Sequence, residues 1–114
     1  MSRRRSDPKH RKLERSTLPS LPPDDPVEAL VARARRARRK GDDRGALVFL
    51  RRACALDEWR ARTHTLLGAE AARQGLVEEA GRALHQARWL RARAGEKARA
   101  DVTARLAAAL VRAA

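Results

Sequence analysis

The sequence predicts an all-α fold of antiparallel helix-turn-helix repeats, about five helices in all, preceded by a basic arm. Two observations predict this fold. Several small and apolar residues recur 34 residues further along the chain: Gly41, Ala46, Leu50 and Ala53 are followed by Gly75, Ala80, Leu84 and Ala87. Such a period, with small residues where helices approach closely, is typical of helical repeat arrays. Aromatic residues make up only 3% of the chain, which argues against a β-sandwich or barrel.

Residues 1–26 are predicted to form a flexible basic arm. This segment lacks any sustained apolar period and is rich in proline towards its end. Such a composition favours an extended, solvated chain over a packed element. Residues 27–113 are rich in Ala, Leu and Arg, which are strong helix formers. The chain therefore divides into the arm and one small helical domain.

The first helix is expected over residues 27–40. Asp24 or Asp25 can accept a hydrogen bond from its first turn, and Pro26 suits that opening position. Apolar residues at intervals of four and three predict one narrow buried stripe on this helix. The stripe consists of Leu30, Ala34 and Ala37.

The second helix is expected over residues 44–57. Gly41 ends the helix before it, and the carboxylates of Asp42 and Asp43 suit the positive end of its dipole. Apolar residues cover most of its circumference, and a helix of that kind packs against neighbours on several sides. We therefore expect it to lie at the centre of the core.

Three more helices are expected over residues 58–73, 77–94 and 96–112, separated at Gly75 and Gly95. Short connections between them require neighbouring helices to run antiparallel. The third helix is expected to bury His64, Leu67, Gly68 and Ala71. The fourth is expected to bury Ala80, Leu84 and Ala87. The fifth is expected to bury Val102, Leu106, Ala109 and Leu110.

The third and fourth helices carry the residues of a known repeat motif. These residues are Leu67, Gly68, Ala71, Ala80, Leu84 and Ala87. They resemble the tetratricopeptide repeat (TPR), in which W-x2-L-G-x2-Y is followed by A-x3-F and then by A. The first repeat matches less well, because Ala34 replaces the glycine and Arg33 the leucine. An unrelated five-helix bundle is the alternative interpretation.

The resemblance covers residues 27–113 as two repeats and a final helix. It implies a TPR-like α-solenoid, a non-enzymatic adaptor or scaffold for protein–protein interaction. The final helix has no partner helix of its own repeat, so it either caps the stack or mediates self-association.

Arginines on the first helix of each repeat are the candidate binding residues. The resemblance implies that this flank lines a concave groove, which holds an acidic segment of a partner protein through arginine–carboxylate pairs. The predicted groove residues are Arg35, Arg38, Arg39, Arg62, Arg73 and Arg99. The alternative is a solvated arginine face that serves solubility only.

The arm supports a second hypothesis, binding of RNA or DNA. The formal net charge of the chain is +13, and a field of that sign attracts polyanions. The cations of the arm are Arg3, Arg4, Arg5, Lys9, Arg11, Lys12 and Arg15. Together with the helical arginines they are expected to bind phosphates by charge, with little preference for base sequence. A tail that only solubilises the protein is the alternative.

No catalytic or metal-binding pattern emerges. Serines occur only before the helical domain, and the three histidines lie far from any pattern of carboxylates or thiols. We therefore expect no enzyme activity, no metal and no cofactor. The single cysteine, Cys54, is expected to be a buried thiol. The chain shows neither a secretory signal nor a stretch able to cross a membrane, which predicts a cytoplasmic protein, and its heavy use of Arg and Ala suggests a bacterial origin.

Trp59 and Trp89 are the remaining residues of note. Both are expected to seal junctions between helices. Trp89 lies off the buried stripe of its helix, which leaves it available as an anchor for a partner.

Overall fold

The computed structural model describes residues 24–113, which form five α-helices. The helices are α2 (Pro26–Arg39), α3 (Asp43–Leu56), α4 (Ala61–Arg73), α5 (Val77–Arg93) and α6 (Lys97–Ala113). The predicted all-α class and the number of helices are therefore confirmed for the described part of the chain. The predicted arm lies outside it, apart from residues 24–26.

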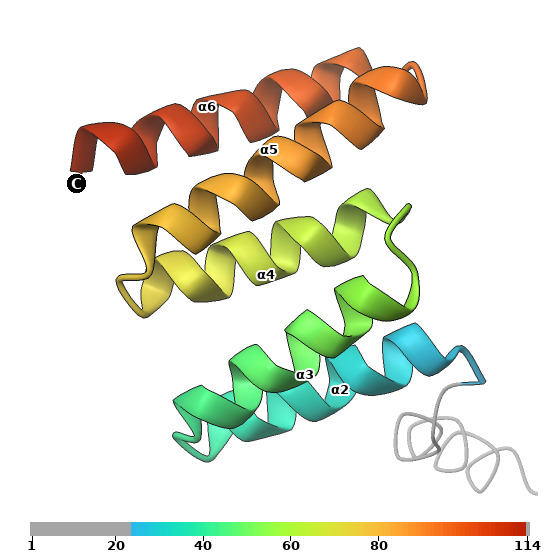
Figure 1. Ribbon diagram of the computed structural model, residues 1–114, viewed down its shortest axis with the longest axis vertical. Helices are drawn as coiled ribbons and strands as arrows, with labels where there is room; N and C mark the ends of the chain where they lie inside the picture. Colours follow the sequence, from blue (N-terminus) through green and yellow to red (C-terminus); the bar gives the residue numbers. More distant parts are fainter. Residues whose placement is uncertain (1–23, 114) are drawn as a thin grey trace, which may run out of the picture.

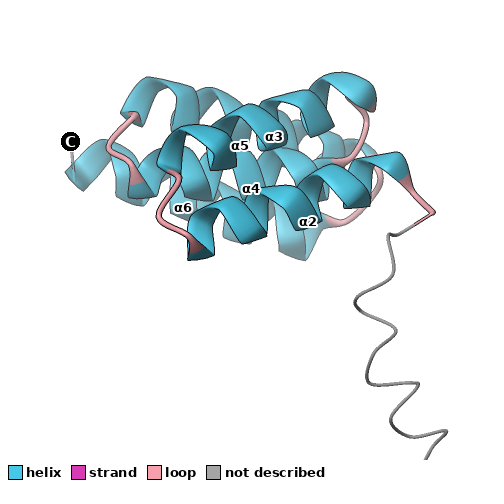
Figure 2. Ribbon diagram, turned by 90° about the horizontal axis from the view of Figure 1, so that it is seen from below, coloured by secondary structure: helices cyan, strands magenta, loops and turns pink. Residues whose placement is uncertain are grey.

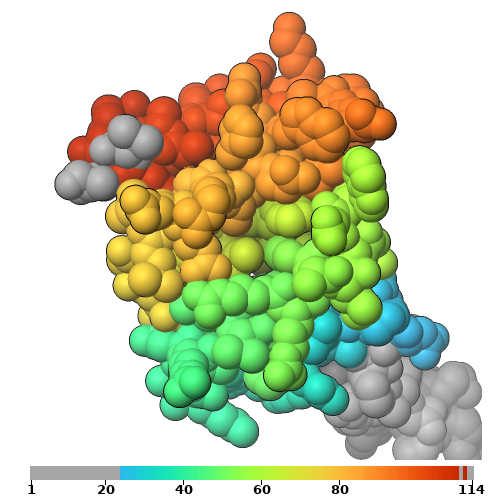
Figure 3. All heavy atoms as spheres, in the orientation of Figure 1, coloured from blue at the N-terminus to red at the C-terminus, as the bar shows by residue number. Residues whose placement is uncertain are grey.

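Consecutive helices run antiparallel and follow one another in a stack from α2 to α6 (Figure 1). Seen along the stack, α3 and α5 lie on one side, and α2, α4 and α6 lie on the other (Figure 2). The closest partners are α2 with α3, α4 with α5, and α5 with α6, whereas α3 and α4 touch less extensively. Side chains fill the spaces between successive ribbons, so the stack is continuous (Figure 3).

Three helices end in the same way. Gly41, Gly75 and Gly95 have positive φ angles of 79°, 81° and 81°, a backbone conformation that glycine adopts without a steric penalty. In all three turns the residue after the glycine donates its N–H to the carbonyl five residues earlier, at 2.8 Å. This is the glycine-dependent stop signal of a helix C-terminus. The three glycines therefore end α2, α4 and α5, as the sequence predicts.

Two helices begin at an aspartate cap. The Asp25 carboxylate accepts a hydrogen bond from the Val27 N–H at 2.9 Å, and Asp42 accepts one from the Gly45 N–H at 2.9 Å. Of the two candidate caps for the first helix, Asp25 is thus the one that is used. These bonds satisfy N–H groups that have no partner within the helix.

The helix α4 begins three residues later than expected, at Ala61 instead of residue 58. The side chain of Asp57 accepts hydrogen bonds from the Trp59 N–H at 3.1 Å and from Arg60 Nε at 3.0 Å. An aspartate that bonds nearby groups competes with helix formation. The segment 57–60 is consequently a connection between α3 and α4.

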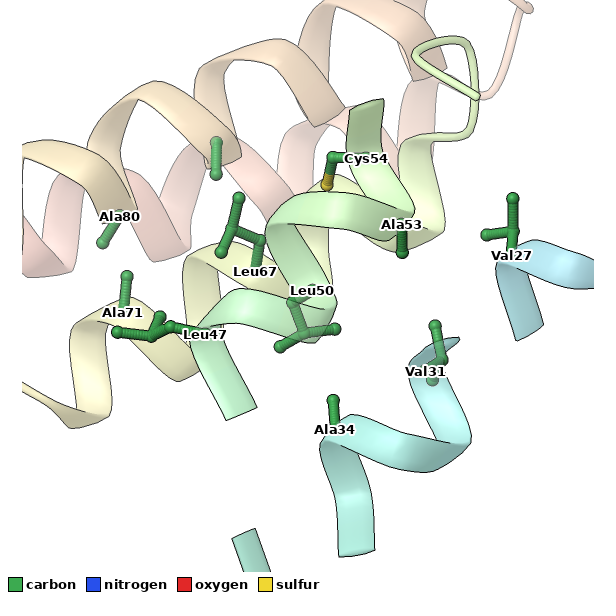
Figure 4. Close-up of a cluster of buried hydrophobic side chains, with 11 residues drawn as sticks. Val27, Val31, Ala34, Leu47, Leu50, Ala53, Cys54, Leu67, Ala71 and Ala80 are labelled. Atoms are coloured by element: carbon green, nitrogen blue, oxygen red, sulfur yellow. The ribbon is translucent and has the colours of Figure 1, made fainter. Parts of the chain in front are cut away.

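The core lies between the two sides of the stack and consists mostly of small residues (Figure 4). Ala53, Ala71, Ala80 and Ala87 have no exposed surface, and the predicted stripe of α5 is confirmed. Alanine at these crossings lets neighbouring helices approach closely. Cys54 is buried in the same cluster, as expected.

Two predicted stripes are wrong in part. On α2, Val27 and Val31 are buried with Ala34 and Ala37, whereas Leu30 is only partly covered. On α4, His64 is likewise only partly covered. Both helices are rotated by a fraction of a turn from the orientation that the apolar pattern predicts.

The predicted stripe of the last helix is also wrong in part: Leu110 packs against the core, whereas Ala109 is exposed. Val102 and Leu106 are 47% and 48% exposed, whereas Ala100 and Thr103 are buried. The smaller side chains face α5 because they allow a closer approach between the two helices. Arg91 of α5 donates a hydrogen bond to the Thr103 hydroxyl at 2.8 Å and reinforces this orientation.

Candidate partner-binding surface

The six predicted groove arginines come from three helices on the same side of the molecule. Arg35, Arg38 and Arg39 belong to α2, Arg62 and Arg73 to α4, and Arg99 to α6. All six are exposed. Four of them, however, are held in ion pairs within the chain, so the surface is less positive than the sequence indicates.

A buried glutamate on α4 holds two of these arginines. The side chain of Glu70 is only 5% exposed and accepts hydrogen bonds from Arg73 Nε at 2.9 Å and from Gln74 Nε2 at 2.8 Å. Arg38 Nε lies 3.8 Å from its other oxygen. Burial alone raises the pKa of Glu70, but the hydrogen bonds from Arg73 and Gln74 outweigh burial and leave this pKa below its usual range.

Two further ion pairs involve groove arginines of α4 and α6. Arg62 Nη2 lies 3.1 Å from the Glu28 carboxylate, which belongs to α2 and stands 34 residues earlier in the chain. Arg99 lies 3.9 Å from Glu96. These acidic partners were not predicted from the sequence. The separation of Glu28 and Arg62, however, equals the 34-residue repeat period, and this signal could have identified the pair.

Arg35 and Arg39 differ from the other four. Neither forms an ion pair with any residue in the range 24–113. They lie four residues apart on α2, so their side chains emerge on the same face of the helix. Within the described residues, no carboxylate compensates their charges.

Arg35 and Arg38 stand at a small apolar cavity between α2 and α4. The cavity has a volume of about 100 Å³. Its apolar lining consists of Val31, Ala34, Leu50, Leu66 and Ala69. Glu70 completes the wall, with its charge already compensated by arginines. The site therefore offers an apolar recess beside Arg35, a guanidinium that pairs with no residue between 24 and 113, which suits an apolar side chain next to a carboxylate.

A second group of cations lies on the outer side of α2. Arg33 and Arg36 of α2 and Lys40, the residue that follows this helix, are exposed and border a shallow hollow of about 320 Å³. Phe49 and the carboxylate residue Asp42 also line this hollow. None of the three forms an ion pair inside the described part of the chain. They are not among the residues predicted from the sequence, although three cations spaced by three and four residues indicate one helix face.

The two tryptophans do not seal helix junctions. Trp59 is 68% exposed and Trp89 is 44% exposed. The prediction that both seal junctions between helices is wrong, whereas Trp89 lies off the buried stripe of its helix, as expected. The seven cations of the predicted arm lie outside the described residues.

Possible metal-ligating side chains are dispersed over the described part of the chain, and its thiol is buried. No three His, Cys, Asp or Glu side chains between residues 24 and 113 gather where they could hold a metal ion. Burial raises the pKa of the Cys54 thiol to about 11, with a smaller contribution from the charge of Glu79. A thiol with that pKa is protonated at neutral pH and is a poor nucleophile.

Comparison with protein-family models and with curated proteins gives no match for this chain. Among the described helices, none combines the length and apolar composition needed to cross a lipid bilayer.

Proposed function

We propose that this protein is a non-enzymatic, tetratricopeptide-like adaptor that binds an acidic segment of a partner protein on the α2–α4 surface, in the cytoplasm. Three observations support the repeat interpretation: the 34-residue period, the shared glycine turns, and the ion pair between equivalent positions Glu28 and Arg62. Gly68 adds a fourth, since it stands at a close helix crossing where the motif has its glycine.

The observation that carries the binding proposal is the free guanidinium of Arg35 beside the α2–α4 cavity. A cavity of about 100 Å³ admits a single apolar side chain. A carboxylate next to that side chain in the partner would meet Arg35, and a second carboxylate would meet Arg39. Charge-assisted pairs between arginine and carboxylate are strong and directional. The preferred ligand is therefore a short acidic segment that carries one apolar residue.

The test is an array of peptides in which one leucine is flanked by glutamates, probed with the full chain. The variant Arg35→Glu/Arg39→Glu should lose binding, because it places two carboxylates beside the cavity. It leaves Arg38 and Glu70 intact, so the fold should persist.

The matched control is the double variant Arg88→Glu/Arg105→Glu, which changes the net charge equally. Arg88 and Arg105 are exposed and lie on α5 and α6, away from the cavity. Equal binding by the parent and by Arg35→Glu/Arg39→Glu would contradict the proposed site. Equal loss in both double variants would show that net charge alone attracts the peptides.

The cations on the outer side of α2 favour a second candidate, an RNA- or DNA-associated protein. Arg33, Arg36 and Lys40 are exposed and unpaired within residues 24–113, and the arm adds seven more cations to the same end of the chain. Binding of this kind would be electrostatic and sensitive to salt.

A further inference from the structure

Trp59 and Trp89 form an exposed aromatic pair, referred to below as the tryptophan pair. Their ring centroids are 6.2 Å apart and their planes are tilted by 39°. Trp59 comes from the connection between α3 and α4, and Trp89 from α5. Two large aromatic side chains that are exposed next to each other form an apolar patch, and such patches are typical of binding sites.

The pair is held in place by charged neighbours. Asp57 fixes the backbone at Trp59 by accepting its N–H at 3.1 Å. Arg93, one turn after Trp89 on α5, places its guanidinium carbon 5.7 Å from the Trp59 ring centroid and 5.2 Å from that of Trp89. Cation–π contacts of this length are favourable. The rings are therefore preorganised, which reduces the conformational entropy that these side chains lose when a ligand binds.

The tryptophan pair borders a shallow hollow of about 430 Å³ whose other walls are Glu58, His85 and Gln86. Gln86 and His85 can donate hydrogen bonds, and the two indole rings supply flat apolar surface. Flat aromatic rings beside hydrogen-bond donors are the chemistry by which proteins bind proline-rich segments in the polyproline II conformation. Charge alone does not select a ligand here, because the carboxylate of Glu58 and the guanidinium of Arg93 both lie beside the rings.

The chain itself contains such a segment. Residues 18–23 read Leu-Pro-Ser-Leu-Pro-Pro. They immediately precede Asp24 and Asp25, and the Asp25 carboxylate lies 2.6 Å from Arg60 Nη1. Arg60 follows Trp59 in the chain, so this contact ties the end of the proline-rich segment to the connection that carries Trp59.

Position and reach agree with an intramolecular contact. The start of α2, the α3–α4 connection and the end of α5 lie at the same end of the helices (Figure 1). A polyproline II helix rises about 3.1 Å per residue, so the seven residues before Asp25 span roughly 20 Å. Because Asp25 pairs with Arg60, the residue next to Trp59, a segment of that length ends beside the connection that carries Trp59.

From these observations we infer that residues 18–23 dock in the polyproline II conformation on the tryptophan pair of the same molecule. The two Leu-Pro dipeptides lie against the indole rings, and backbone carbonyls of the segment accept hydrogen bonds from Gln86 and His85. The contact holds the proline-rich segment against the α3–α4 corner of the helical domain. This surface is separate from the α2–α4 cavity, so the inference does not depend on the proposed adaptor function.

The chain reports on this contact directly, because Trp59 and Trp89 are its two tryptophans and it has no tyrosine. The experiment compares the full chain with its variant Pro19→Ala/Pro22→Ala/Pro23→Ala. The variant should show a red-shifted tryptophan emission and a larger acrylamide quenching constant, because the rings lose their cover. The control variant Ser16→Ala/Thr17→Ala should match the parent. A peptide of residues 17–24, added to the proline variant, should reverse both changes.

Three results would overturn the inference. Unchanged quenching in the proline variant would show that the segment does not cover the rings. A difference that depends on protein concentration would assign the segment to a neighbouring molecule. An oligothymidylate that quenches the emission of parent and proline variant alike would assign the tryptophan pair to single-stranded nucleic acid. Far-ultraviolet circular dichroism verifies that each variant keeps its helices.

Discussion

Gly68 occupies a point where α4 crosses α5 without room for a side chain. A Cβ atom at this position would lie 2.7 Å from Leu84 Cγ, 2.8 Å from Leu84 Cδ2 and 3.3 Å from the Ala80 carbonyl oxygen. The first two distances are well below van der Waals contact, so a side chain would displace Leu84 or separate the helices. The close crossing predicted from the L-G pair of the motif is thus confirmed by geometry.

We expect Gly68→Ala to destabilise the protein by about 1–3 kcal/mol, because forcing an extra carbon into a packed crossing shifts its neighbours. Gly68→Leu should be worse. A thermal melt followed by circular dichroism measures the effect, and for a domain of this size about 1 kcal/mol corresponds to 4–8 °C.

Gly81 provides the matched control. It lies inside α5 with no atom within 4 Å of a Cβ. Gly81→Ala should therefore stabilise the helix by about 0.5–1 kcal/mol through propensity alone. A melting temperature of Gly68→Ala equal to or higher than that of the parent would contradict the close crossing.

Single residues also mark what the sequence could not predict. The face that carries Arg35, Arg38 and Arg39 follows from helix periodicity, and their exposure is confirmed. Which arginines remain unpaired depends on contacts across helices, and Glu70 meets Arg38 only because α2 and α4 lie side by side. Periodicity within one helix contains no information about such partners.

At the scale of elements, Glu70 joins three helices. Glu70 accepts a hydrogen bond from Arg73 within α4 and lies near Arg38 of α2. Arg73 also pairs with Asp43 of α3, whose carboxylate lies 2.6 Å from Arg73 Nη2. Buried charges are tolerated only when such partners are present. This cluster fixes how α2, α3 and α4 meet near the α2–α4 cavity.

The lowered pKa of Glu70 predicts a loss of stability in acid. A carboxyl group whose pKa is lower in the folded than in the unfolded state stabilises the fold above its unfolded pKa, and this contribution disappears as the pH falls through the folded value. The melting temperature of the parent should therefore fall from about pH 5 downward.

The variant Glu70→Gln shows how much of this pH dependence comes from Glu70 and how much from the other carboxylates. At pH 7 it should be less stable by about 1 kcal/mol, because the arginines that Glu70 pairs are exposed and screened by solvent. The difference should shrink between pH 5 and pH 3, where the parent carboxylate gains a proton. Parallel melting curves for the two proteins over that range would contradict the assignment.

Helix ends were easier to predict than helix faces. The glycine stops and aspartate caps act locally, so α2, α3 and α5 begin and end within one residue of the expected positions. The buried face of α6 was predicted wrongly because it has several apolar stripes, and its contact with α5 selects the one with the smaller side chains. The start of α4 was missed because Asp57 bonds the connection before it.

At the scale of the whole molecule, charge is distributed unevenly. The net charge is +13, and ion pairs on α4 and α6 engage several of the arginines that the sequence assigns to a groove. Five cations that pair with no described residue lie close together at the α2 end of the stack, namely Arg33, Arg35, Arg36, Arg39 and Lys40, and seven more lie by sequence in residues 1–16. A partner that carries many negative charges is therefore expected to approach from the α2 end of the stack.

Deleting residues 1–16 tests whether these cations act on nucleic acid. Cations that neutralise phosphates release counterions, so the logarithm of the binding constant falls with the logarithm of salt concentration by about 0.9 per phosphate on duplex DNA. The truncated chain should bind one duplex oligonucleotide more weakly and with a shallower salt dependence, measured by fluorescence anisotropy at several salt concentrations.

The helix content of the truncated chain should match that of the parent, because the deleted residues contribute no apolar stripe to the core. Truncation should weaken binding evenly across oligonucleotides of different sequence, since phosphate contacts do not read bases. If the full chain fails to bind even at low salt, the nucleic-acid candidate is wrong and the adaptor proposal stands alone. If both forms bind with the same salt slope, the cations of the helical domain are the site. Charge reversal at Arg33, Arg36 and Lys40 then tests whether the α2 end carries it, and binding should be abolished.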